Sequence, residues 1–95
     1  MSRTLLGYCG VDSGQLIVVD PCYLKEWKDG EYNKSDNHYG LACDATLSEA
    51  QGGEVLVAGI AGTGVAFSSG WGDGCYPVYA HYNSDGRIGK IEILF

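Results

Sequence analysis

The sequence predicts an all-β domain: a small antiparallel β-sandwich or partly open barrel of six or seven strands, with at most one short helix. Short apolar runs, several of them alternating with polar residues, recur between clusters of Gly, Ser, Asp and Asn. The 95 residues include 15 glycines, which disfavour helix interiors and supply tight turns. A sandwich or an open barrel lets such strands bury two apolar faces. The length fits one domain covering residues 1–95.

The first strands are predicted at 4–11 and 15–20, with an Asp-Ser-Gly turn between them. The run 15–20 is almost continuously apolar, which is typical of a strand buried on both faces. Pro21 ends this strand because proline cannot donate a ladder hydrogen bond. The segment 21–40 is expected to be a surface excursion, in which the residues around Trp27 have the spacing of one or two helical turns.

Three further strands are predicted in the middle of the chain, at 38–47, 54–61 and 65–68. The first two are separated by a polar turn at 48–53, and the third follows a Gly-Thr-Gly reversal at 62–64. The Val, Leu and Ile residues of 54–61 favour an extended backbone there.

The C-terminal part is predicted to be a hairpin. Residues 75–83 alternate in polarity, and Pro77 places their strand at a sheet edge or at a bulge. Ser84-Asp85-Gly86 is a strong turn sequence, and residues 87–95 form the last strand.

The charge balance excludes two classes of partner. Twelve acidic against six basic residues give a net charge of −6. Nonspecific binding to nucleic acid and to anionic membrane surfaces depends on clustered Lys and Arg. We therefore expect neither a nucleic acid nor a membrane as partner.

The cysteines and the N-terminus indicate a cytoplasmic protein. Residues 1–7 lack the apolar core of a signal peptide, and the weakly polar run 55–67 is too short for a membrane span. In such a compartment thiols stay reduced. The spacings of Cys9, Cys22, Cys43 and Cys75 do not match a zinc motif, so no metal is expected.

No catalytic constellation stands out, and we expect neither a catalytic residue nor a cofactor. Asp12, Asp20 and Asp73 lie at strand ends, where they can hold a divalent cation or simply cap turns. A thiol nucleophile would need a nearby imidazole. Along one regular strand, however, positions six residues apart are separated by roughly 20 Å. A small metal- or Cys-dependent hydrolase acting on a nucleotide remains the enzymatic alternative.

Aromatic residues give the clearest binding signal. Seven Tyr and two Trp outnumber two Phe, and Tyr and Trp suit stacking on heteroaromatic ligands and interfaces. Trp71 lies between two glycines in a predicted loop after two serines, so the binding edge is expected at 68–76. The predicted ligand-binding residues are Ser68, Ser69, Gly70, Trp71, Gly72, Asp73 and Tyr76, with Tyr23, Lys25, Trp27 and Arg87 in support. In this prediction Trp71 and Tyr76 stack on bases, while the serines, the loop amides and the cations meet phosphates.

Three segments resemble a family of small phage and bacterial β-domains: residues 11–15 with Asp-Ser-Gly, residues 19–23 with Asp-Pro-Cys-Tyr, and residues 70–79 with Gly-Asp-Gly-Cys-Tyr-Pro-Val-Tyr. Some similar small phage proteins are sponges that sequester the nucleotide second messengers of bacterial antiphage systems. Those messengers are CBASS-type cyclic dinucleotides or Thoeris-type ADP-ribose derivatives. The resemblance therefore implies a non-enzymatic anti-defence protein that evades host immunity by binding a cyclic nucleotide. If a phage encodes it, the expected location is the host cytoplasm.

So small a domain offers little concave volume, so we expect a homo-oligomer with a ligand site shared between protomers. A protein-interaction module, whose partner meets the Tyr and Trp surface, is the second alternative.

Overall fold

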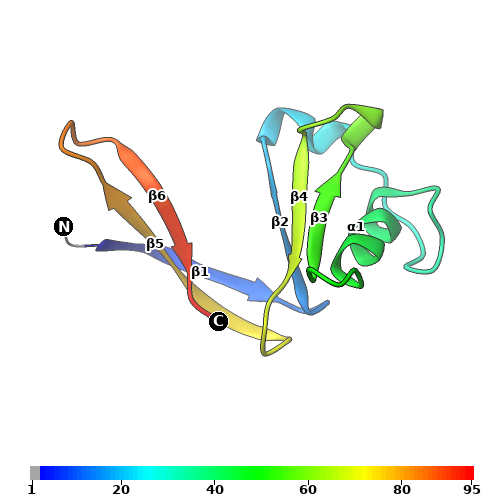
Figure 1. The fold of residues 1–95 in the computed structure, drawn as a ribbon, viewed down its shortest axis with the longest axis horizontal. Coiled ribbons are helices and arrows are strands. Elements are labelled where there is room, and N and C mark those ends of the chain that lie inside the picture. Colours follow the sequence, from blue (N-terminus) through cyan, green and yellow to red (C-terminus); the bar gives the residue numbers. More distant parts are fainter. Residues whose placement is uncertain (1–2) are drawn as a thin grey trace. The chain divides into compact units, whose positions relative to one another are not determined.

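The structure, a computed structural model, describes residues 3–95 of the chain. The described residues form six strands in two antiparallel three-stranded sheets, one α-helix and two short 3-10 helices. The predicted all-β class is thereby confirmed. The chain divides into two compact units, which we call the terminal unit and the central unit. The terminal unit combines the segment ending at Gly14 with Ser69–Phe95, and the central unit is Gln15–Ser68 (Figure 1).

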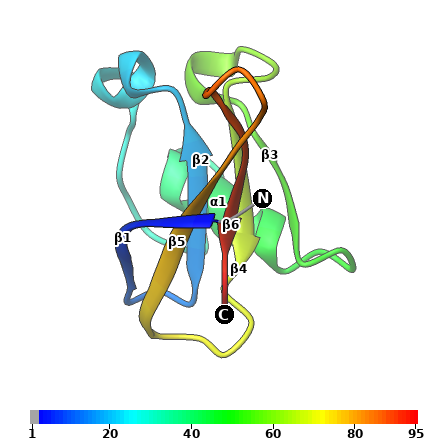
Figure 2. The ribbon, with the colours of Figure 1, turned by 90° about the vertical axis from the view of Figure 1, so that its left-hand side faces the viewer.

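The terminal unit is one sheet of strand order β1-β5-β6, formed by β1 (Arg3–Val11), β5 (Gly74–Tyr82) and β6 (Ile88–Ile93) (Figure 2). The strands predicted for these regions are confirmed. Val11, Tyr76 and Ala80 are buried on one face of this sheet. The predicted hairpin turn is confirmed as well, because the Gly86 N–H donates to the Asn83 carbonyl at 3.0 Å between β5 and β6.

The predicted edge or bulge position of Pro77 is wrong, because β5 is the central strand and the register shift with β1 occurs between Leu5 and Gly7. The Pro77 carbonyl accepts from the Leu94 N–H at 3.3 Å, so its imino nitrogen faces the β6 side. The last residue of β5 paired with β6 at this end is Val78. Pro77 lies one residue outside the last β5–β6 pair, Val78–Ile93. A central strand tolerates proline at this position because no ladder hydrogen bond to β6 requires its N–H.

The central unit is a second sheet of order β2-β4-β3 with one helix packed on it. Its strands are β2 (Gln15–Val19), β3 (Gly52–Val55) and β4 (Gly64–Ser68). The buried core consists of Ala42, Val55 and Ala66, and the half-buried residues packed around it are Ile17, Trp27, Leu41 and Ala45.

The expectation that residues 15–20 are buried on both faces is wrong. The strand β2 pairs only with β4, at the edge of the sheet, and the Val18 side chain is 61% exposed. Apolar continuity alone did not distinguish a central strand from an edge strand. The following residues, Pro21–Glu26, form the 3-10 helix η1, which agrees with the predicted helical turns.

The strand predicted at 38–47 is wrong: His38–Thr46 is the α-helix α1. Asn37 caps its N-terminus, because the buried Asn37 Oδ1 accepts from the Gly40 N–H at 2.7 Å. Leu41, Ala42 and Ala45 then fall on one helical face, which packs on the core. Gly40 has to be glycine, since a Cβ there would lie 1.8 Å from the Lys34 carbonyl oxygen.

The strand predicted at 54–61 is also shorter than expected. It ends at Val55, and Val57–Gly59 forms the 3-10 helix η2 with Ala58 at φ 54°. Thr63 fixes this turn, because its hydroxyl accepts from the Val57 N–H and donates to the Ile60 carbonyl, both at 2.7 Å. Among residues 3–95 no helix is long and apolar enough to cross a membrane.

Candidate functional site

Residues 69–74, which we call the Trp71 loop, enter β5 in a fixed conformation. The fully buried Ser69 donates its hydroxyl to the Gly72 carbonyl at 2.6 Å, and the Tyr76 hydroxyl donates to the same carbonyl at 2.8 Å. An Asp73 carboxylate oxygen accepts from the Gly14 N–H at 3.0 Å. The loop is therefore bonded to Tyr76 on β5 and to Gly14, which lies between β1 and β2 in the chain.

Trp71 lies at the tip of this loop and is 85% exposed. Gly70 and Gly72 adopt φ of 72° and 92°, in the left-handed region that a side chain disfavours. The Trp71 N–H donates to the Ser69 carbonyl at 2.8 Å. The backbone on both sides of Trp71 is thus held while the indole projects into solvent.

Ser69, Asp73 and Tyr76 therefore hold the loop in place. The Tyr76 ring is 9% exposed and packs edge-on against Phe95, with ring centroids 5.1 Å apart. Within the predicted binding edge, Trp71 is the aromatic ring with an open face. Sequence reasoning placed all four residues in one segment but did not separate the exposed ring from its supports.

The remaining predicted residues lie elsewhere. Tyr23, Lys25 and Trp27 belong to the central unit, as does Ser68, whose N–H donates to the Gln51 carbonyl at 2.9 Å. Arg87 follows the end of β5 that is far from the Trp71 loop, and the nine residues of this strand span about 26 Å, eight steps of roughly 3.3 Å. Arg87 and the Trp71 loop therefore cannot meet the same small ligand within one terminal unit.

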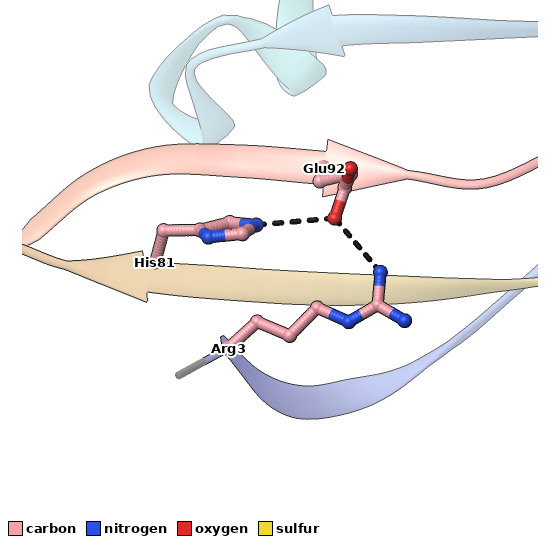
Figure 3. Close-up of polar contacts among 3 residues, drawn as sticks. All are labelled: Arg3, His81 and Glu92. Atoms are coloured by element: carbon pink, nitrogen blue, oxygen red, sulfur yellow. Dashed lines mark hydrogen bonds and ion pairs between the residues drawn. The ribbon is translucent and has the colours of Figure 1, made fainter. Parts of the chain in front are cut away.

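Arg3 joins a polar cluster that links all three strands of the terminal unit (Figure 3). One Glu92 carboxylate oxygen lies 3.0 Å from Arg3 Nη1 and 3.1 Å from His81 Nε2. The hydrogen bonds from His81 and then from Arg3 lower the pKa of Glu92. The guanidinium carbon also lies 4.0 Å from the centre of the Tyr79 ring. This cation is already paired within the sheet.

A cleft of about 700 Å³ lies in the central unit beside α1, and sequence reasoning missed it. Leu41, Ala45, Val55 and Leu56 supply its apolar lining. Polar side chains complete the lining and include Lys28, Asp36, His38, Asp44 and Glu54. Leu41, Asp44 and Ala45 have the i, i+3, i+4 spacing that places residues on one face of a helix, and all three line the cleft. The sequence analysis missed this pattern because it predicted a strand for the region.

Two observations on the described residues concern the metal-ligating side chains and the Cys22 thiol. No group of three His, Cys, Asp or Glu side chains within residues 3–95 is arranged to hold a metal ion. The four cysteines are free thiols. Desolvation, followed by the hydrogen bond and the charge of Asp20, raises the pKa of the Cys22 thiol, which disfavours the nucleophilic thiolate.

The fold and the Trp71 loop define a small all-β protein that presents one tryptophan from a fixed loop. A family model described as "Protein of unknown function (DUF4241)" matches residues 4–93. The chain therefore belongs to the DUF4241 family. No curated protein sequence and no solved structure matches it.

Proposed function

We propose that this protein is a non-enzymatic binding protein that holds a planar heteroaromatic ligand against Trp71. The supporting observation is the 85% exposure of that indole on a loop fixed by Ser69, Asp73 and Tyr76. An exposed ring on a fixed backbone loses little conformational entropy when a ligand stacks on it. A flexible loop would have to be ordered by each binding event.

The ligand class we propose is a nucleotide second messenger of a bacterial antiphage system, a cyclic nucleotide or an ADP-ribose derivative. The nucleobase would stack on Trp71, and amides of the glycine-rich loop would meet the phosphates. Arg3 is engaged by Glu92, so it adds little positive charge for such a ligand. A second copy of the chain would supply the opposite wall of the site, which makes the proposed assembly a homo-oligomer acting in the bacterial cytoplasm.

The test is a titration of cyclic di- and trinucleotides and ADP-ribose derivatives, followed by indole fluorescence. A Trp27→Phe background leaves Trp71 as the only tryptophan. We expect a ligand of this panel to quench the fluorescence and to raise Tm. Trp71→Ala, which lacks the reporter and is therefore followed by Tm, should weaken binding about fivefold to 150-fold, in line with a stacking contribution of about 1–3 kcal/mol.

Tyr32→Ala is the matched control, because Tyr32 is also exposed, at 67%, but lies in the central unit. It should leave the affinity unchanged. Recovery of the intact ligand after heat denaturation separates sequestration from hydrolysis. Unchanged fluorescence and Tm across the whole panel would contradict the nucleotide proposal.

A protein-interaction module is the second candidate, and a row of exposed apolar residues favours it. Tyr8 on β1 pairs with Pro77 on β5, and Leu94 donates its N–H to the Pro77 carbonyl from the other side. The Tyr8 and Leu94 side chains are 67% and 38% exposed. A pull-down that succeeds without nucleotide and fails with both Trp71→Ala and Tyr8→Ala would favour this candidate over the first.

A further inference from the structure

The cleft beside α1 has the size and lining of a small-ligand site. Its volume of about 700 Å³ falls within the roughly 300–1,000 Å³ typical of such sites. Leu41, Ala45 and Leu56 contribute apolar surface together with Val55, which belongs to the core of this unit. An aliphatic or aromatic body of a ligand would be desolvated against these side chains.

The charge around the cleft is negative. Asp36, Asp44 and Glu54 contribute three acidic residues to its lining, and Lys28 contributes a basic one. The net charge of the lining therefore favours a cation over an anion.

The three carboxylates differ in whether they already accept a hydrogen bond from the protein. An Asp36 oxygen accepts from Asn37 Nδ2 at 3.0 Å. This hydrogen bond lowers the pKa of Asp36, and the charges of Lys28 and Lys34 lower it further. A Glu54 oxygen accepts from the Gly62 N–H at 3.3 Å. Among the described residues, none forms a hydrogen bond or an ion pair with the Asp44 carboxylate, which is exposed.

The negative charge of Asp44 also interacts unfavourably with the dipole of α1. It lies in the last turn of α1, where the partial charge of the helix is negative and a basic residue is favourable. The last turn of α1 contains no basic residue. A cation bound at this end of the cleft would offset both the Asp44 charge and the carbonyl groups of the helix terminus.

We propose that the cleft beside α1 binds a small organic cation, an ammonium group carried on an apolar body, with Asp44 as its counter-ion. The ammonium group donates to the Asp44 carboxylate while the apolar body packs on Leu41, Ala45 and Leu56. This site lies wholly in the central unit and is independent of the nucleotide proposal for Trp71.

The probe is n-hexylammonium, compared with hexan-1-ol and hexanoate, which share its chain but are neutral and anionic. Binding to the full chain is followed by ¹⁵N–¹H chemical-shift changes. We expect hexylammonium to shift the amides around Leu41, Asp44 and Leu56 and to bind more tightly than either analogue. Asp44→Asn should raise its Kd about threefold to fivefold, the upper part of the range for an exposed ion pair.

Two further measurements separate ligand binding from a structural role. Asp85→Asn removes the same charge from a turn in the terminal unit and should leave the Kd unchanged. Without ligand, Asp44→Asn should leave Tm equal to or above that of the unaltered protein, because it removes an unfavourable charge from the helix end.

The proposal is overturned if hexanoate or hexan-1-ol binds as tightly as hexylammonium, if Asp44→Asn leaves the Kd unchanged, or if the shifts lie outside the cleft. A short lysine-containing peptide that binds far more tightly than hexylammonium would also overturn it, since the cleft would then recognise a protein segment.

Discussion

Single residues with precise partners hold much of this small structure together, and Glu92 is the clearest case. Its carboxylate receives Arg3 from β1 and His81 from β5 while it lies on β6 (Figure 3). One acidic side chain therefore links three strands across one face of the terminal sheet. Its pKa is lowered by the hydrogen bonds from His81 and Arg3, so the carboxylate is more stable in the folded protein than in the unfolded chain.

Glu92 should make stability depend on pH in the acid range. Because its folded pKa lies below the unfolded value of about 4.3, its contribution is present above that value and is lost as pH falls through the folded pKa. We expect Glu92→Gln to lower the urea midpoint slightly at pH 7 and to have no such effect near pH 2. Glu49→Gln, at an exposed position outside the cluster, is the control. A Glu92→Gln effect of equal size at both pH values would contradict this assignment.

At the same scale, the sequence predicted the loop around Trp71 but did not distinguish the exposed ring from the residues that support it. Flanking glycines correctly predicted that Trp71 lies in a loop. Ser69 and Tyr76 belong to the same motif, yet their hydroxyls both reach the Gly72 carbonyl, a convergence that depends on the three-dimensional course of the loop. A residue type and its position in sequence do not distinguish a ligand contact from a bond within the loop.

At the scale of the element, α1 depends on its N-cap. The Asn37 side chain accepts from the Gly40 N–H and donates to the Glu31 carbonyl at 3.1 Å, so it joins the helix to the preceding loop. We expect Asn37→Ala to reduce the free energy of unfolding by about 2 kcal/mol, the upper range for a cap residue, because a buried partner is also lost. Urea unfolding followed by circular dichroism measures this change.

Asn33→Ala gives the comparison for that prediction, since Asn33 is exposed and precedes the helix without capping it. Its effect should stay within about 0.5 kcal/mol, as for most surface substitutions. Equal losses for the two variants would show that the cap bond has little energetic role.

The strands were predicted more accurately than the helix, for a physical reason. In β1, β5 and the β5–β6 turn, alternation and turn residues act locally, so the sequence shows them directly. In α1 the apolar residues are few and small, and Asn37 and Gly40 act through contacts with the loop residues Glu31 and Lys34. The cleft depends on that helix, so it could not be predicted without it.

At the scale of the whole molecule, the two units divide the chain unequally. The central unit is one uninterrupted segment with its own helix, three strands and buried core, whereas the terminal unit joins the two ends of the chain. Gln15 and Ser68, the first and last residues of the central unit, are paired across β2 and β4. The two ends of the central unit therefore lie next to each other in the sheet.

This arrangement predicts that residues 15–68 fold without the terminal unit. Their sheet pairings and their buried core lie within the segment. We expect the isolated segment to unfold cooperatively on heating, with dispersed amide resonances from β4 and α1. Ala66→Asp in the same segment should abolish both signals, because it buries a charge at a fully buried position. A segment whose spectra match those of the Ala66→Asp variant would contradict the prediction.

The pairing of Gln15 with Ser68 has a consequence for the evolution and engineering of this family. Paired residues in neighbouring strands have Cα atoms only about 5 Å apart. A short linker between residues 14 and 69 could therefore replace the whole intervening segment, and a different module with equally close ends could be grafted there. The three-strand scaffold and its tryptophan would then stay constant while the inserted module diversifies.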